Sequence, residues 1–175
     1  MFSLRRYKSD EQVSLRAVRP DDRERIVKAF QALEGRSVYL RFFAYKKELS
    51  EEELRRVTQS DGVTEAVLVA TVGSGDRETV VGLGSYVRNG SAADIAFAVE
   101  EDFQGRGIAS RLLQRLADIA RTNGIVRFEA DVLAENTSML AVLRNSGLRM
   151  RTRYAEGVVH ATLSLTQRGD CMDET

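Results

Sequence analysis

Cysteine and histidine are nearly absent from this chain of 175 residues. The one cysteine, Cys171, stands in a polar tail, which excludes an internal disulfide and a cluster of cysteine metal ligands. The one histidine, His160, lies in a segment with strand character, and there is no second histidine to complete a zinc site or a histidine-based triad. We therefore interpret His160 as a structural residue and expect no metal.

Long apolar runs and an excess of one charge are missing as well. No stretch approaches the roughly 20 apolar residues of a membrane span, and the start, MFSLRRYKSDE, lacks the apolar segment of a signal peptide. The 26 basic and 26 acidic side chains balance, which argues against nucleic acid or an anionic membrane as partner. We expect one soluble, cytoplasmic domain over residues 1–175, with a core at about 13–166. Its oligomeric state is left open.

Apolar periodicity and turn residues predict the order β-α-α-β-β-β-α-β-α-β-β. Pro20 and two acidic residues open the first helix, and Ser50 with Glu53 matches a capping box before a later one. The predicted strands include 13–18, 64–72, 79–88, 125–133, 149–155 and 157–166, and two further helices begin near Gly107 and Asn136. The three strands before Gly107 form an antiparallel meander.

A glycine-rich turn at residues 99–109 joins a strand to an amphipathic helix. Apolar and small residues alternate before it, and apolar residues recur at helical spacing after it. Gly105 and Gly107 therefore stand at a helix N-terminus, where free N–H groups and the helix dipole favour an anion. We interpret the turn as a phosphate-binding loop.

The spacing of this loop distinguishes among phosphate-binding motifs. The Gly-Lys-Ser/Thr of a Walker loop is absent. A dinucleotide-binding loop, which would indicate an oxidoreductase, needs glycine or alanine three residues after Gly107, where Ser110 stands, although Glu129 and Asp131 lie near the acidic offset of that motif. Glycines that merely begin the helix are the alternative without a ligand.

The run Gln104-Gly105-Arg106-Gly107-Ile108-Ala109 resembles the signature Gln/Arg-x-x-Gly-x-Gly/Ala of the GNAT superfamily of N-acetyltransferases. The order of elements over most of the chain is similar to that of the same fold. The resemblance implies an α/β fold with a mixed, mostly antiparallel sheet of six to seven strands, about four helices and splayed central strands. It also implies that the loop binds the pyrophosphate of acetyl-CoA and that pantetheine pairs with backbone between the splayed strands.

The cofactor-binding residues that this resemblance implies are Phe97, Ala98, Val99, Gln104, Gly105, Arg106, Gly107, Ile108, Ala109 and Asn136. Asn136 is equally suited to cap the helix that follows it.

Residues 37–43 and 93–97 resemble the catalytic domain of bacterial protein-lysine acetyltransferases (Pat-like). This resemblance implies transfer to the lysine ε-amine of a protein such as an acyl-CoA synthetase, with Arg41 and Arg151 as substrate-binding residues. The aromatic residues around Arg41 are interpreted as core. The subgroup joins this domain to regulatory domains, which we expect to be absent.

Asp94 is the candidate general base, because an amine must lose a proton before it attacks a thioester. Strand parity places Asp94 on the same face as Ala96 and Ala98. The subgroup generally has glutamate at this position, so the shorter aspartate acts through a longer water bridge or leaves the role to Glu101 or Glu100. An ion pair with an arginine is the structural alternative.

Leu143 occupies the position where many acetyltransferases have a tyrosine that protonates the departing thiolate. The protein-lysine subgroup also tends to lack this tyrosine, and Tyr154 is the other candidate acid. Arg149, Arg151 and Arg153 alternate along one strand face, where they can meet acidic residues around a target lysine. Two other functions stay open: acetylation of a small-molecule amine, and acyl-CoA sensing without catalysis.

Overall fold

Seven segments of the chain pair into one sheet in the computed structural model, which describes residues 11–33, 35 and 48–166. The strands are β1 (Ser14–Ala17), β2 (Glu65–Val72), β3 (Thr79–Asn89), β4 (Ala92–Val99), β5 (Arg127–Leu133), β6 (Arg149–Ala155) and β7 (Val158–Ser164). They lie in the order β1-β2-β3-β4-β5-β7-β6, and only the β4–β5 pair is parallel. The predicted mixed, mostly antiparallel sheet is confirmed.

The described residues also form four α-helices: α1 (Arg23–Ala32), α3 (Glu51–Thr58), α4 (Ile108–Thr122) and α5 (Thr137–Arg144). Short 3₁₀ turns occur at η1 (Pro20–Asp22), η2 (Gly75–Arg77) and η3 (Glu101–Phe103). The predicted capping box begins α3, where Ser50 and Glu53 exchange side-chain and backbone hydrogen bonds. The second predicted helix is therefore α3, whereas residues 37–43, including Arg41, lie outside the described residues.

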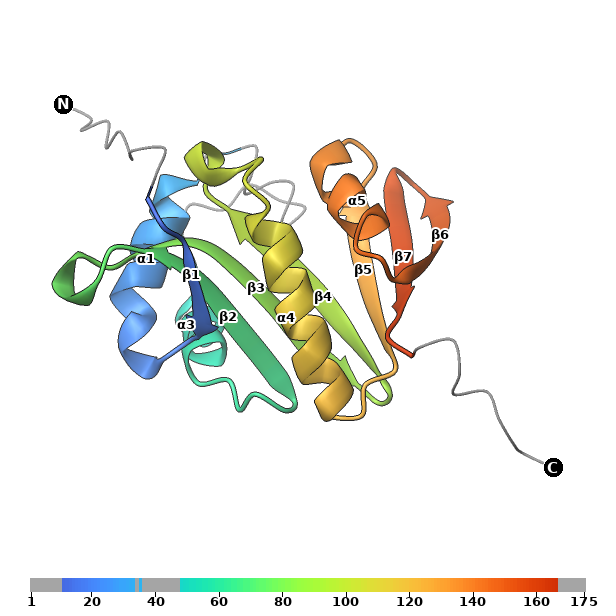
Figure 1. Cartoon of the computed structure of the whole chain (residues 1–175), viewed down its shortest axis with the longest axis horizontal. Coiled ribbons are helices and arrows are strands. Elements are labelled where there is room, and N and C mark those ends of the chain that lie inside the picture. The colour runs from blue at the N-terminus through green and yellow to red at the C-terminus, as the bar shows by residue number, and fades with distance from the viewer. Residues whose placement is uncertain (1–10, 34, 36–47, 167–175) are drawn as a thin grey trace.

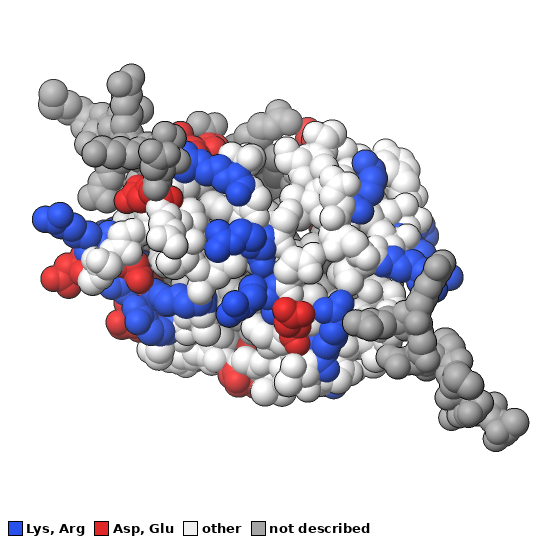
Figure 2. Space-filling view, in the orientation of Figure 1, with Lys and Arg blue, Asp and Glu red and all other residues white. Residues whose placement is uncertain are grey.

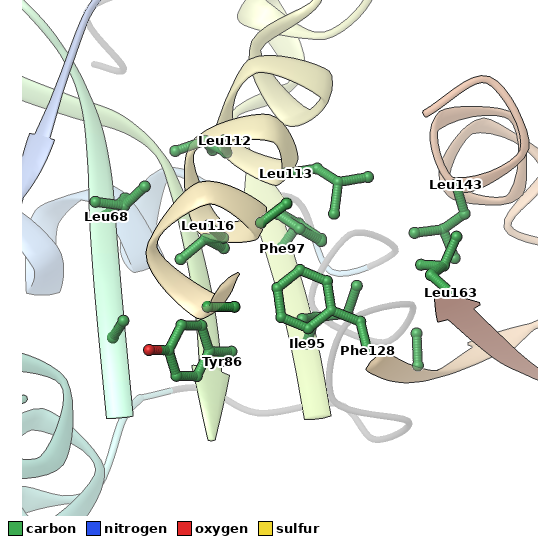
Figure 3. Close-up of a cluster of buried hydrophobic side chains, with 14 of the residues drawn as sticks. Leu68, Tyr86, Ile95, Phe97, Leu112, Leu113, Leu116, Phe128, Leu143 and Leu163 are labelled. Carbon is green, nitrogen blue, oxygen red and sulfur yellow. The ribbon is translucent and has the colours of Figure 1, made fainter. Parts of the chain in front are cut away.

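Helix α4 covers one face of β2, β3 and β4, and it appears across the sheet in Figure 1. Its buried residues recur at helical spacing and pack on Leu68, Phe97 and Phe128 of the strands, as Figure 3 shows. Gly84 permits this close approach, because a Cβ there would stand 2.9 Å from the Phe97 ring and 3.2 Å from Leu112. The sheet and α4 thus form one apolar core, and α1 contacts β3 as well.

The parallel pairing of β4 with β5 ends after three residue pairs, Ala92 with Arg127, Ala93 with Phe128 and Asp94 with Glu129. Beyond Asp94 the two strands separate, so they lie close at one end and apart at the other in Figure 1. The separated part of β5 still pairs with β7 along its whole length. The predicted splay of the central strands is therefore confirmed, and Asp94 marks where it begins.

A network of charged side chains joins β1 to the start of α1. The fully buried carboxylate of Asp22 accepts two hydrogen bonds of 2.7 Å from Arg16, another from the backbone N–H of Arg19, and one of 3.2 Å from Arg25. Glu78 pairs with Arg16 and Arg25 from the β2–β3 connection. Burial acts to raise the pKa of Asp22, but the Arg16 and Arg19 hydrogen bonds outweigh it and hold the pKa at about 2.

We expect Asp22→Asn to lower the free energy of unfolding by about 3 kcal/mol, because it leaves the half-buried guanidinium groups of Arg16 and Arg25 without the buried carboxylate that pairs with them. Asp21→Asn is the matched control, since Asp21 is 69% exposed and its ion pairs contribute about 1 kcal/mol or less. Urea unfolding at neutral pH measures both values. Equal losses in the two variants would contradict a structural role for the buried network.

The stability difference between wild type and Asp22→Asn should also depend on pH. The pKa of Asp22 is depressed in the folded state, so its contribution is present above the ordinary value of 3.8 and is lost as pH falls toward about 2. Urea unfolding between pH 2 and 7 should therefore show a difference that is constant above about pH 5 and shrinks below about pH 4. A difference that grows on acidification would contradict this assignment.

Candidate active site

The separated strands border a cleft of about 940 Å³, named here the central cleft. It is lined by residues 94–99 of β4, 129–132 of β5, 104, 105 and 107–110 of the glycine-rich loop and α4, and 135–139, 142 and 143 around α5. Because β4 rises about 3.3 Å per residue, Asp94 lies about 17 Å from Val99 and the loop. The cleft is long enough to place a phosphate and a reacting group at opposite ends.

The glycine-rich loop fits an anion at the α4 end of the cleft. Gly105 and Gly107 have φ of +75° and +78°, and no heavy atom lies within 4 Å of the position where a Cβ of either would stand. The first turn of α4 contains no acidic residue, so no carboxylate of that turn competes for its free N–H groups. The side chain of Gln104 donates to the carbonyl of Val99 at 3.0 Å and ties the loop to the end of β4.

Nine of the ten predicted cofactor-binding residues line this cleft. The exception is Arg106, whose guanidinium carbon lies 4.7 Å from the centre of the Phe103 ring, outside the lining. Asn136 does cap α5, because its side-chain oxygen accepts from the N–H of Met139 at 3.2 Å. It also lines the cleft, so capping and ligand contact are compatible.

Asp94 lies at the far end of the cleft, beside two acidic residues of β5. Glu129 is its register partner, and Asp131 follows on the same face. Although Asp94 as a whole is exposed, partial burial of its carboxyl raises the pKa, and the charges of Glu129 and Asp131 raise it further. The Asp94 carboxylate is therefore a stronger base than an isolated aspartate, as a proton acceptor requires.

A second cavity, named here the inner cavity, lies on the other side of β4 and measures about 370 Å³. Helices α1 and α3 form one wall, and strands β3 and β4 form the other. Asp94, Ala96 and Ala98, which share a face by strand parity, line both cavities, and so does Ile95. The alternative bases are divided between them, since Glu101 lines the central cleft and Glu100 lines the inner cavity.

Glu100 is the second carboxyl with a raised pKa in this region. Burial raises it most, and the neighbouring charges of Asp102 and Glu101 add to the effect. Its backbone N–H donates to the carbonyl of Val81 at 2.9 Å, which places Glu100 at the end of the β3–β4 pairing. It is therefore about 20 Å along the chain from Asp94 and close to the loop.

Charged residues continue across the sheet face that carries Asp94. The register joins Asp94, Glu129, Thr162 and Arg151 in one row across β4, β5, β7 and β6. Arg149 and Arg153 lie in the flanking rows and are exposed, as is Arg151, so the predicted arginine face is confirmed. Among the described residues, none of these three arginines has an ion pair or hydrogen bond through its side chain.

His160 pairs with Asp131, with 2.5 Å between Nδ1 and Oδ1, and so helps to order the row next to Asp94. Tyr154 is 67% exposed on β6 and lines neither cavity, which removes it from the reacting end of the cleft. Leu143 is buried at 1% exposure and faces the core near Leu163, as Figure 3 shows. The cleft wall at this position is apolar.

Sequence reasoning missed the carboxylates of Glu129 and Asp131 as neighbours of Asp94. Their alternation in β5 was visible, but the parallel register that brings them beside β4 connects segments about 35 residues apart.

Within residues 11–33, 35 and 48–166, no three potential ligand side chains are placed to hold a metal ion. The described helices are all too short or too polar to span a membrane. Acidic and basic groups are interspersed over the α4 side in Figure 2.

Residues 12–149 match the sequence model of the acetyltransferase (GNAT) domain. The acetyltransferase Pat of Mycolicibacterium smegmatis is 32% identical over 136 residues, which are 76% of this chain and 40% of that protein. The chain thus matches less than half the length of this curated relative.

Solved structures give the same result for the fold. The GNAT domain of S. lividans PAT is 31% identical, superposes with a TM-score of 0.79, and is matched over 90% of this chain and 99% of its own. The yncA protein of Salmonella typhimurium, solved with its cofactor acetyl-CoA, is 16% identical with a TM-score of 0.68, over 93% of this chain and 98% of its own. At that identity the second match supports the fold alone.

We expect Gly107→Val to weaken acetyl-CoA binding by at least tenfold, because a side chain there obstructs the approach of a phosphate to the loop amides. Gly124→Val is the matched control. Gly124 also has a positive φ, +75°, and open space around it, but it ends α4 away from the cleft. Both variants should lose similar stability from backbone strain. Calorimetric titration of the folded variants would contradict the loop assignment if both bound acetyl-CoA equally.

Proposed function

Because the chain belongs to the GNAT family of acetyltransferases, we propose that it transfers an acetyl group from acetyl-CoA to a lysine ε-amine on the surface of a protein. The family predicted from Gln104–Ala109 is confirmed, and an acyl-CoA synthetase is the protein class that the Pat-like resemblance suggests as acceptor. The observation that carries the proposal is the place of Asp94, an exposed carboxylate at the end of the central cleft and at the edge of an open, charged sheet face.

The chain's residues would hold acetyl-CoA along the length of the central cleft. The amides that follow Gly105 and Gly107 bind the pyrophosphate at the α4 N-terminus. The backbone of residues 97–99 has no partner strand on the β5 side, so its polar groups are available to pantetheine. This arrangement brings the thioester toward Asp94.

Asp94 takes the role of general base, directly or through a water molecule. A lysine ammonium first gives up a proton to reach the neutral amine. The amine nitrogen then attacks the thioester carbonyl carbon, the C–N bond forms and the C–S bond breaks. The nitrogen loses its second proton, and the coenzyme A thiolate takes one proton, so one proton is released for each amide formed.

The apolar wall at Leu143 leaves protonation of the thiolate to water. A thiolate is stable enough to leave without a general acid beside it, because the thiol pKa is about 8 to 9. This chemistry is consistent with the Pat-like resemblance, in which the usual tyrosine is absent. Activity therefore does not depend on Tyr154.

The arginines of β6 favour a protein as the acceptor. Adjacent strands are about 4.8 Å apart, so the Arg151 backbone lies about 14 Å from that of Asp94 along their shared row. A polyamine or an aminoglycoside is itself cationic and has no acidic group to place against Arg151. A protein that presents its lysine to Asp94 can place acidic groups against Arg149, Arg151 and Arg153, which aids encounter and orientation. Arg41, the other predicted substrate-binding residue, lies outside the described residues.

We expect Asp94→Asn to lower kcat by about 10²- to 10⁴-fold while acetyl-CoA affinity changes little, because the amide has similar size but cannot accept a proton. Glu101→Gln is the comparison variant, since Glu101 lines the same cleft near the loop. Asp94→Glu should retain or increase activity. Steady-state kinetics with calorimetry decide: a loss below about tenfold in Asp94→Asn, or a larger loss in Glu101→Gln, would contradict the assignment.

The pH dependence of kcat at saturating acceptor should report the same group. Activity is lost as pH falls through the pKa of Asp94, which lies above its ordinary value of 3.8. Asp131→Asn removes a like charge, so it should shift the acidic limb to lower pH, whereas loss of structure alone would not move it. A shift to higher pH would contradict the electrostatic coupling.

We expect a folded acyl-CoA synthetase to be acetylated at one dominant lysine, at least tenfold faster than the matching free peptide. Arg151→Glu should reduce the rate on the folded protein and its dependence on salt, but not the rate on the peptide. Arg115→Glu, on the exposed side of α4, is the control of equal charge change. Intact-protein mass spectrometry and kinetics test this. Equal rates on peptide and protein, or preference for a polyamine or aminoglycoside, would overturn the protein-lysine proposal.

A further inference from the structure

The inner cavity begins where the reaction would take place. The residues that line both this cavity and the central cleft are Leu33, Asp94, Ile95, Ala96 and Ala98. Residues 96 and 98 are alanines, and their short side chains leave space at this junction. The two cavities therefore meet beside the proposed position of the thioester. An acyl group held at Asp94 therefore lies at the mouth of the inner cavity.

The walls of the inner cavity are mainly apolar. Phe30 and Val57 line it from the helices, and Leu83 and Val87 line it from β3. Three of its charged residues have partners: Arg56 pairs with Glu65, which also lines the cavity, at 3.5 Å. Glu53 accepts the N–H of Ser50 at the α3 N-terminus. Apart from the carboxylates of Asp94 and Glu100 on the β4 side, the interior thus offers mainly dispersion contacts.

The two sides of the junction differ in chemistry. The sheet face beyond Asp94 is exposed and charged, which suits an arriving lysine and its protein. The inner cavity is apolar, and its volume of about 370 Å³ falls within the range of ligand pockets, about 300 to 1,000 Å³. An acetyl group has a single methyl and would leave this space unfilled.

We propose that the inner cavity receives the hydrocarbon chain of an acyl-CoA, so that the protein transfers straight acyl groups of about three to six carbons as well as acetyl. This inference rests on the proposed function for its reaction but concerns the donor. The atoms balance as for acetyl transfer: the lysine nitrogen gains the acyl carbon, the C–S bond breaks, the thiolate takes one proton, and one proton is released. No further reactant is needed.

Binding of the donor tests the proposal without any acceptor. Each methylene that enters an apolar site strengthens binding by up to about fourfold, so butyryl-CoA should bind about tenfold more tightly than acetyl-CoA. Hexanoyl-CoA should bind at least as tightly as butyryl-CoA. Calorimetric titration of free coenzyme A and the three acyl-CoAs gives this series. Affinity that is flat or falls with chain length would overturn the proposal.

Leu83→Phe provides the structural test, because the longer aromatic ring narrows the inner cavity from β3, where Leu83 is half-buried. The ratio of hexanoyl-CoA to acetyl-CoA affinity should fall by about tenfold in this variant. Val63→Phe is the matched control, since Val63 is 48% exposed and lines neither cavity, and it should keep the wild-type ratio. Thermal melting verifies that both variants are folded. An unchanged ratio in Leu83→Phe would overturn the assignment of the cavity.

Transfer assays separate this inference from the proposed function. With a folded acyl-CoA synthetase as acceptor, kcat/KM should rise from acetyl to butyryl donors. Transfer of acetyl alone, with no binding gain for longer donors, leaves the proposed function in place and overturns the acyl-chain inference. Chain-length-dependent binding without transfer to any protein lysine would leave the acyl-chain inference in place and overturn the proposed function. If Leu83→Phe slows all donors equally by raising KM for the acceptor, the cavity holds the acceptor and the inference is wrong.

Discussion

The early end of the β4–β5 pairing is the constraint on which the rest of the site depends. Three residue pairs hold the strands together, and after Asp94 the backbone of β4 has no partner on that side. Buried backbone groups must be satisfied, so a strand that stops pairing inside a sheet needs another partner. The opening creates a cleft with an exposed row of hydrogen-bonding groups, and an extended ligand can complete the sheet there.

The two halves of the sheet are held at this divergence by different contacts. On one side α4 packs its apolar stripe against β2, β3 and β4, with Gly84 allowing the close approach. On the other side β5 pairs fully with β7, and Leu143 of α5 packs into the core. Because both halves are firmly packed, the cleft between them is a fixed feature of the fold and not a gap left by weak packing.

The position of Asp94 links the geometry of the sheet to its chemistry. Parallel register places Glu129 beside it, Asp131 lies in the next row, and both charges raise its pKa. The same residue stands between three environments: the central cleft, the apolar inner cavity and the open charged face. If Asp94 is the base, as proposed, its place at this junction lets the coenzyme, the acyl chain and the acceptor arrive from different sides.

The sequence by itself determined the elements and the glycine-rich loop. These features arise from local rules, since strand alternation, helical spacing, the Ser50–Glu53 cap and the positive φ of Gly107 depend on neighbouring residues. The tertiary structure alone decided which carboxylates surround Asp94 and that a second cavity opens beside Ala96. Each of these follows from strand register and from helices packing across the sheet, contacts between segments far apart in the chain that no local pattern encodes.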